Sequence, residues 1–444
     1  MLKKTLLIGL LLSAVTAMAQ STGSQAMTLS LDDCIKIALN DNPTIKINEM
    51  ELERVDYAKK ETLGKLFPDI SFSAQYTRNL ALQTIYMDTG TGEAAAIKMG
   101  RDNTHSTGFS ASIPIIVPQL WKSIKLNDNQ ILQNLEKSRA DKLSLVNQVK
   151  NAYYALLLAQ DTKKVIEQNH STAQAHADIY KKQHELGTAS EYDVLRANVA
   201  VTNLEPSILE ADNSIKQLKL QLKLLMGMDA AIEIAPAQTL DQFKGVMYEH
   251  SLSTDTTLAY NTSLKSLDLQ TDYLKKALDV QKAAWYPTIT GSASYAWNSM
   301  SNGSPFKNFR WTSMSSVGLT LAFPLFQGGQ RYSKQKQAEI AVREMKWQRE
   351  NLERSLHTQV QVQMDNLNKS LKQIESNDAG VKQATKASDI MNKSFKIGAA
   401  SFIQLRDTDD ALMNARLSYY QAIYNYLVAD SNLEYVLGNS QYAN

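Results

Sequence analysis

The sequence predicts a mostly α-helical protein made of a duplicated half, with long antiparallel coiled-coil helices and a smaller transmembrane β-barrel portion. Internal repetition, long stretches without Gly or Pro, and short alternating segments carry this prediction. The segment LFPDISFSAQYTRN at Leu66 returns as WYPTITGSASYAWN at Trp285, 219 residues later. Two copies indicate a duplicated half with pseudo-twofold symmetry, because a solenoid needs three or more repeats to bury its core.

Residues 1–19 have the pattern of a secretory signal peptide. Lys3 and Lys4 precede a Leu-rich run, and the small residues Ala17 and Ala19 flank Met18 before Gln20. Such a segment is too short to remain in a membrane as a spanning helix. Without the two lysines the chain holds 45 basic and 45 acidic residues, so its charge predicts no nucleic-acid partner.

The first half opens with two predicted helices, Leu31 to Leu39 and Pro43 to Leu66. Asn42 directly before Pro43 is a typical helix start, and Asn261 stands at the same place in the second copy. The single cysteine, Cys34, has no partner for an internal disulfide. We expect it to be a half-buried residue of the first helix.

Four segments alternate apolar and polar residues, as strands with one apolar face do. The apolar sides are rich in Phe, Tyr and Trp, and the opposite sides are mainly Ser and Thr. The predicted strands are residues 69–79, 106–114, 287–298 and 311–324, and each copy contributes one hairpin with a polar connection, residues 80–105 and 299–309.

This pattern suits a wall with lipid on one side and water on the other, although a soluble sheet packed on helices has the same pattern. No segment after the signal has the roughly 20 apolar residues of a spanning helix, so insertion would use strands. Four strands cannot close a barrel. Two chains would give eight strands and a filled interior, whereas three give twelve and room for water, which favours a homotrimer.

Long helices follow each hairpin, over about residues 119–226 and 329–437. The stretch from Gln119 to Leu186 has no Gly or Pro, and Gly380 alone interrupts Gln330 to Ile397. At about 1.5 Å per residue each stretch gives on the order of 100 Å of helix, which indicates a coiled coil. Gly187 and Gly398 then end the outgoing helices, and one returning helix of some 37 residues is expected after each.

Heptad seams support antiparallel hairpins with the glycines at their tips. The first returning seam is Leu204, Ile208, Ala211, Ile215, Leu218, Leu222 and Leu225, and the second is Ala415, Tyr419, Ala422, Tyr426, Ala429, Leu433 and Val436. A shorter outgoing seam is Val146, Val149, Tyr153 and Leu156.

Over nearly the whole mature chain the sequence resembles the TolC family of outer membrane efflux proteins. The opening LSLDDCIKIALNDNP, the FPDI and YPTI strand starts, and the two glycine tips with their seams carry this resemblance. The expected division is a signal peptide (1–19), a first TolC-like repeat (20–227), a linker or equatorial segment (228–255), a second repeat (256–438) and a C-terminal tail (439–444).

The resemblance implies a homotrimer with a twelve-stranded barrel and a periplasmic α-barrel, located in the outer membrane with a periplasmic extension. It implies a passive duct in contact with outer membrane lipid. Its partners would be a periplasmic membrane fusion (adaptor) protein and an inner-membrane pump of RND or ABC type. The tips that would contact the adaptor are Leu186, Gly187, Thr188, Ile397, Gly398 and Ala399.

The family narrows its periplasmic entrance with acidic residues after the second tip and ties it to a site after the first. Matching by position from Gly398 places Gln404 and Asp407 at the acidic sites, and matching from Gly187 places Tyr192 and Asp193 at the partner site. Gln404 departs from the usual acid, so one ring of three carboxylates remains in a trimer. The alternative is that both aspartates are solvated residues near a helix start, stabilised by its positive end.

No enzyme, cofactor or metal site is expected. The sequence has no GxxxxGK[ST], nucleophile elbow or HExxH motif. His170, His176 and His184 share one helix at spacings of six and eight, which do not suit a metal pair, so we expect surface positions.

Two alternatives to an efflux duct remain at this point. Within transport, the chain could serve type I protein secretion. Outside transport, it could be a periplasmic structural coiled-coil protein whose strands form a soluble cap. The transported substrate cannot be read from the sequence, because in a passive duct the pump and the adaptor choose it.

Overall fold

A computed structural model describes residues 26–88, 94–245, 247, 257–305, 307, 309–439 and 442. The predicted signal peptide therefore lies outside the described residues. The chain divides into two compact units. The first unit comprises Met1–Glu49, Lys137–Leu264 and Leu352–Asn444, and the second comprises Met50–Glu136 and Lys265–Asn351.

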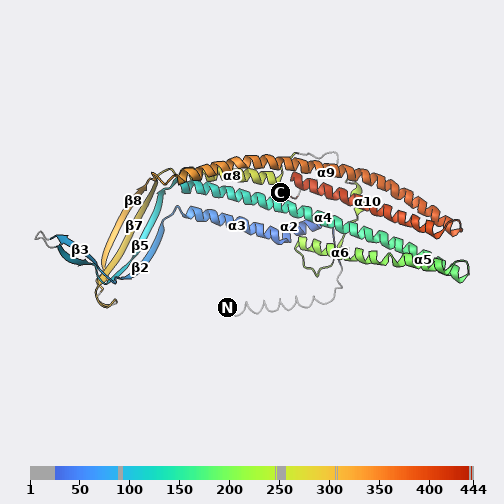
Figure 1. Ribbon diagram of the computed structural model, residues 1–444, viewed down its shortest axis with the longest axis horizontal. Coiled ribbons are helices and arrows are strands. Elements are labelled where there is room, and N and C mark those ends of the chain that lie inside the picture. Colours follow the sequence, from blue (N-terminus) through green and yellow to red (C-terminus); the bar gives the residue numbers. More distant parts are fainter. Residues whose placement is uncertain are drawn as a thin grey trace, which may run out of the picture. The chain divides into compact units, whose positions relative to one another are not determined.

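The second unit contains an antiparallel sheet of four strands in the order β2-β5-β7-β8. The strands lie where the alternation predicts them, and β5 joins the two hairpins by pairing with β7 (Figure 1). Their bounds are Asp69–Arg78 for β2, Asn103–Ile116 for β5, Thr288–Ser301 for β7 and Thr312–Ala322 for β8.

The register gives this sheet one mainly apolar face and one mainly polar face. Phe72 pairs with Phe109, which pairs with Tyr295, on the apolar face. On the other face four serines form a row across all four strands, in the order Ser71, Ser110, Ser294 and Ser316. The apolar face is exposed, with Val317 88% and Leu319 75% accessible. The sequence prediction of one apolar and one polar face is confirmed.

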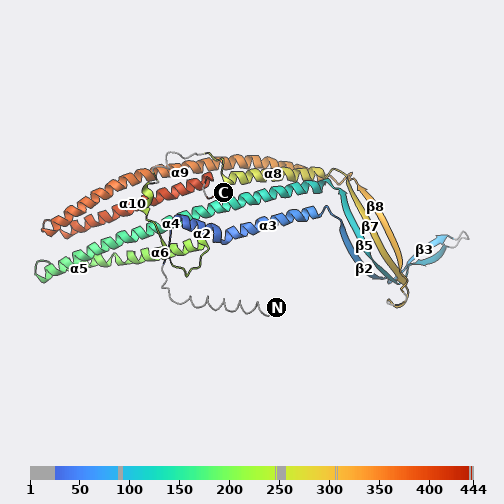
Figure 2. The same ribbon diagram turned by 180° about the vertical axis from the view of Figure 1, so that it is seen from behind.

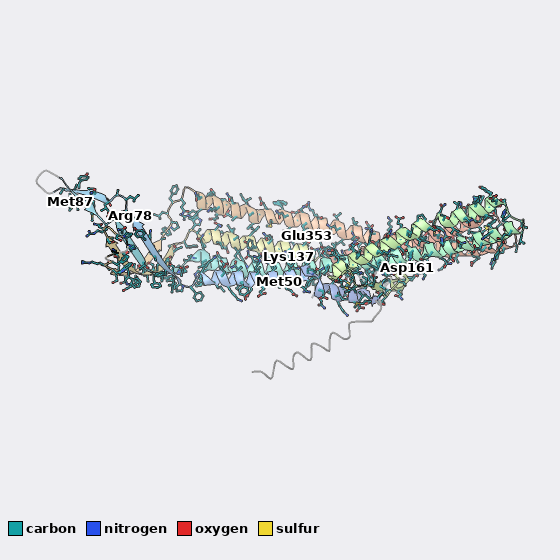
Figure 3. All side chains as sticks on the ribbon, turned by 90° about the horizontal axis from the view of Figure 1, so that it is seen from below. Met50, Arg78, Met87, Lys137, Asp161 and Glu353 are labelled. Atoms are coloured by element: carbon teal, nitrogen blue, oxygen red, sulfur yellow. The ribbon has the colours of Figure 1, made fainter. Side chains whose placement is uncertain are left out.

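A further, smaller β-hairpin lies in the connection between β2 and β5, where the sequence predicted only a polar stretch. Strand β3 (Gln83–Asp88) pairs with β4 (Ala94–Met99), and Asn79 closes the base by donating to the carbonyls of Arg101 and Asp102, each at 2.8 Å. Figure 3 labels Arg78 at the end of β2 and Met87 on β3. The prediction of a plain connection over residues 80–105 was wrong, because two strands of only six residues among Gly and polar residues give too short an alternation to identify.

The chain forms two long helical hairpins, whose tips and returning helices belong to the first unit (Figure 2). Helix α4 (Pro118–Glu185) is followed by α5 (Glu191–Thr202) and α6 (Glu205–Met226), and α9 (Gln330–Lys396) by α10 (Phe402–Leu437). The predicted seams lie inside: Val146, Val149, Tyr153 and Leu156 are at most 3% exposed, and all seven members of each returning seam are buried or half-buried. Sequence periodicity therefore placed the core of both hairpins correctly.

The returning helix of the first copy is not continuous, and that prediction is corrected. It breaks between Thr202 and Glu205, directly before Pro206. Proline has no N–H to donate to the carbonyl four residues earlier, and it disfavours helical geometry in the residue before it. Leu417 occupies the equivalent place in α10, which runs unbroken.

Short elements from the first described residues and from the middle segment pack on the helices of the first unit. Strand β1 (Met27–Leu29) pairs in parallel with β6 (Ile234–Pro236), and Tyr153 donates to the carbonyl of Leu29 at 3.1 Å. The 3-10 helix η1 (Leu240–Phe243) begins with an N–H that donates to Asp161, labelled in Figure 3. These pairings were not predicted, since three-residue strands leave no periodicity.

In both copies the end of the returning helix, α6 or α10, is bonded to the asparagine that starts another helix. Helix α2 (Leu31–Asp41) leads to α3 (Pro43–Gly64), and Asn42 accepts from Thr44 N–H and donates to the carbonyl of Leu225. In the second copy Asn261 precedes α8 (Thr262–Ala283), where it accepts from Leu264 N–H and donates to the carbonyl of Val436. Cys34 in α2 is fully buried, rather than half-buried as expected.

Candidate functional site at the helical tips

The two tips are built alike, and each begins with a glycine that ends a long helix. Gly187 has φ +73° and Gly398 has φ +74°, a conformation that residues with a Cβ rarely adopt. The N–H of Thr188 donates to Gln183 and that of Ala399 to Ser394, both at 2.8 Å. These bonds close a Schellman motif, which satisfies carbonyls at the helix end.

The next turn at each tip is a capping box. Ser190 caps α5, where its hydroxyl donates to Asp193 at 2.6 Å, and Ser401 caps α10, where its N–H donates to Gln404 at 2.9 Å. Asp193 and Gln404 therefore occupy equivalent structural positions, both at N3 of a returning helix. The departure from an acid at Gln404 keeps the capping function, because an amide oxygen also accepts the bond.

Asp407 differs from these two residues because its carboxylate takes no part in the cap. Its side chain is 60% exposed, and Nη2 of Arg406 donates to its Oδ1 at 3.2 Å. Nε of the same Arg406 lies 3.8 Å from Oδ2 of Asp410. Tyr192 is 67% exposed. Of the four predicted gate residues, Asp407, Tyr192 and Gln404 are exposed, and only Asp407 and Tyr192 have side chains that take no part in a capping box.

Each tip also presents one large apolar side chain to solvent. Leu186 is 79% and Ile397 81% exposed, at matched positions directly before the two glycines. No protein atom lies within 4 Å of a Cβ built on Gly187 or Gly398. The backbone conformation, and not crowding within this chain, therefore explains the choice of glycine at the tips.

The hairpins meet behind the tips in an aromatic cluster. Tyr180 of α4 lies 5.7 Å from Phe395 of α9 and 5.2 Å from Phe402 of α10, measured between ring centroids. Burial raises the pKa of the Tyr180 hydroxyl. Ala197 and Val201 complete this core, which joins the two hairpins within one chain.

His176 is buried beside this cluster, which corrects the prediction of a surface position. It is 7% exposed, and its Nε2 lies 3.1 Å from Oδ2 of Asp409, itself 8% exposed. Sequence reasoning missed the pair because a lone histidine on a long helix gives no sign of which neighbour covers it. Among the described residues no group of three His, Cys, Asp or Glu side chains could hold a metal ion.

Proteins of known structure share this arrangement of a four-stranded sheet and two long helical hairpins. The channel CusC superposes with a TM-score of 0.76 at 17% identity, over 95% of this chain and 96% of that one. The open MtrE outer membrane channel of Neisseria gonorrhoeae gives 0.71 at 15% identity, over 95% and 93%. The fold is therefore that of these outer membrane channels.

Sequence comparisons give the family. The sequence profile described as "Outer membrane efflux protein" matches residues 34–228 and 254–439, so the chain belongs to that family. Outer membrane protein TolC of Escherichia coli is 22% identical over 98% of this chain and 85% of its own length. The alkaline protease secretion protein AprF of Pseudomonas aeruginosa is 23% identical, over 93% and 85%.

The predicted family, the helical fold class and the outer membrane location with a periplasmic extension are confirmed. Membership makes the chain an outer membrane efflux channel, a transport protein and not an enzyme. It also decides against the structural coiled-coil alternative.

Within the described residues, no helix is both long and apolar enough to cross a membrane.

Proposed function

We propose that three copies of this chain form one duct, with a shared β-barrel of twelve strands in the outer membrane and an α-barrel in the periplasm. The observation that carries this proposal is the open four-stranded sheet with an exposed apolar face. Its outer strands, β2 and β8, each pair on one side only among the described residues. Unpaired edges are costly in lipid, and four strands are too few to close.

The polar face of the sheet suits a water-filled interior. Its central row consists of serines, and the neighbouring row consists of Asp69, Ser112, Ser292 and Gly318. The side chains of these two rows are short and leave room along the wall. Three such walls would form a wide, mainly Ser-lined passage, which is consistent with a duct whose cargo is chosen elsewhere.

The duct would receive substrates from an inner-membrane pump through a periplasmic adaptor. The exposed Leu186 and Ile397, each beside a glycine turn, support a contact between an adaptor and the tips formed by residues 186–188 and 397–399. A pump of RND or ABC type would supply the energy. Among the relatives, the toluene efflux pump protein TtgC of Pseudomonas putida is 22% identical over 93% of this chain.

Type I protein secretion is a second candidate function. The names of two relatives favour it, since AprF and PrtF of Dickeya chrysanthemi are described as protease secretion proteins. Expression in a cell that lacks its own outer membrane channel distinguishes the two. Restored resistance to small toxic molecules supports efflux, whereas restored release of a secreted protease supports secretion.

We also propose that Asp407 narrows the periplasmic entrance as a ring of three carboxylates. Its exposure and its position nine residues after Gly398 support this role. Tyr192 and Asp193 would be its partner site. Gln404 would occupy the other gate position after the second tip, without a charge. Within the described chain no hydrogen bond joins Asp407 to Tyr192 or Asp193, so their contact would come from a neighbouring copy.

Conductance in planar bilayers tests the trimeric duct and its gate together. Asp407→Ala should raise single-channel conductance and lower the preference for cations, because it removes both bulk and negative charge from the narrowest ring. Asp389→Ala, at an exposed carboxylate of α9, is the matched control and should leave both unchanged. Unchanged conductance in Asp407→Ala would refute the gate, and monomers in mild detergent would refute the trimer.

A further inference from the structure

The buried carboxylate of Asp409 joins three helices at the level of the proposed gate. It accepts a hydrogen bond from the Ser388 hydroxyl of α9 at 2.8 Å and contacts His176 Nε2 of α4 at 3.1 Å, while belonging to α10 itself. Ser388 is 6% exposed and also accepts from Asn392. We name His176, Ser388 and Asp409 the hairpin joint, because they connect the first hairpin to the second.

The hairpin joint lies directly behind Asp407. Two residues along an α-helix correspond to a rotation of about 200°, so Asp407 and Asp409 project from opposite sides of α10. Their exposure agrees, since the Asp407 side chain is 60% and the Asp409 side chain 9% accessible. Whatever holds Asp409 against α4 therefore also sets how far Asp407 projects from the other side.

The joint is directional, unlike the apolar contacts beside it. The rings of Tyr180, Phe395 and Phe402 would keep part of their contact if the hairpins slid by an ångström or two, because apolar burial has no preferred direction. Hydrogen bonds weaken steeply with such a displacement. A buried carboxylate that lost its donors would also remain desolvated without compensation, which makes the joined state strongly preferred.

A cavity of about 190 Å³ adjoins the joint where the helix break separates α5 from α6. It is lined by Asn169, Ala173, His176, Ala200, Asn203, Leu204, Phe402, Arg406, Asp409 and Asp410. Arg406 connects this cavity to the gate, because its guanidinium also binds Asp407. The charged groups near Asp409 are thus Arg406 and Asp410 on its own helix, and the imidazole of His176 faces it from α4.

We infer that His176, Ser388 and Asp409 are positioning residues for the gate, which fix α10 so that Asp407 projects into the entrance. This inference rests on the proposed gate function of Asp407. It assigns the buried joint, rather than the exposed tips alone, as the element that sets the width and charge of the entrance.

Bilayer measurements on five single variants and two double variants test this inference. Asp409→Ala should raise conductance and lower cation preference as Asp407→Ala does, although the Asp409 charge does not reach the passage. Asp389→Ala, at the exposed carboxylate of α9 outside the joint, is the control and should match the unaltered protein. Asp409→Asn should also match it, because the amide keeps the shape and can bond to both Ser388 and His176.

The double variant Asp407→Ala with Asp409→Ala shows whether the joint acts through the gate. Its cation preference should equal that of Asp407→Ala alone. A further fall would overturn the positioning role, and so would an unchanged Asp409→Ala in a protein whose Asp407→Ala variant responds. If Asp407→Ala itself has no effect, the gate assignment fails and the positioning role fails with it.

His176→Phe keeps the test decisive if Asp409→Ala does not assemble. Phenylalanine fills the space beside Phe395, which lies 5.9 Å from the His176 ring, but it offers no hydrogen bond to Asp409. We expect His176→Phe to fold, to remain trimeric and to shift conductance in the direction of Asp407→Ala. The shift should be absent when Asp407→Ala is already present, and an additive shift would contradict the inference.

Discussion

Replacing Gly438 by alanine should destabilise the protein far more than the same change at a tip glycine. Gly438 ends α10 with φ +69°, and its backbone lies against the chain before α8. A Cβ at this position would lie 2.1 Å from the carbonyl oxygen of Tyr260, a distance that no relaxed structure allows. Gly227 in the first copy has the same arrangement, with 2.6 Å to the carbonyl oxygen of Asp41.

Two terms make up the expected cost. The left-handed conformation costs a residue with a Cβ about 1 to 2 kcal/mol. The clash also forces the two backbones apart, and Arg139 bridges them by donating to the carbonyls of Tyr260 and Gly438, each at 3.0 Å. Weakening these charge-assisted bonds costs about 1.5 to 3 kcal/mol. The total is about 2.5 to 5 kcal/mol.

Gly398→Ala is the control that separates the two terms. Its φ of +74° nearly equals that of Gly438, but nothing lies within 4 Å of the added Cβ, so only the conformational cost remains. Denaturant unfolding of the detergent-solubilised protein, followed by circular dichroism, measures both variants. Gly438→Ala should lose about 2 kcal/mol more than Gly398→Ala. Equal losses would refute the argument from close approach.

Two further predictions concern titratable groups of the first unit. Burial raises the pKa of the Cys34 thiol to about 12, so maleimide at neutral pH should label it only after unfolding, and labelling of the folded protein would contradict its burial. Hydrogen bonds from Lys382 and Lys244 lower the pKa of Asp378, so its contribution to stability is present above the ordinary carboxyl pKa and is lost as pH falls through the lowered value. Asp378→Asn should therefore be less stable at pH 7 but lose less melting temperature between pH 5 and pH 3, and a parallel loss would count against the pairing.

Local patterns in the sequence were enough for most of the helical frame. Alternation identified β2, β5, β7 and β8, and the heptad seams identified the buried sides of α6 and α10, because both patterns follow directly from backbone geometry. The glycines at 187 and 398 marked the tips, since few other residues tolerate that conformation. The weak point was Pro206, which was present in the sequence but lies within an otherwise regular seam.

The candidate site was predicted only in part. Position relative to the glycines identified Asp407, whereas the capping roles of Asp193 and Gln404 became clear from their hydrogen bonds to Ser190 and Ser401. Both serines stand three residues before those side chains, so the capping box was available as a sequence signal. The hairpin joint had no such signal, because His176 and Asp409 are 233 residues apart.

The sequence alone determined the duplication, the long helices, the strand faces and the places where the chain turns back. These features depend on neighbours within a few residues, where the period of the backbone fixes which side chains share a face. Only the tertiary structure decided that His176 is buried against Asp409, that β1 pairs with β6, and that Gly438 admits no side chain. Such contacts depend on which distant segments fold together, and a burial pattern along one helix does not reveal the partner that covers it.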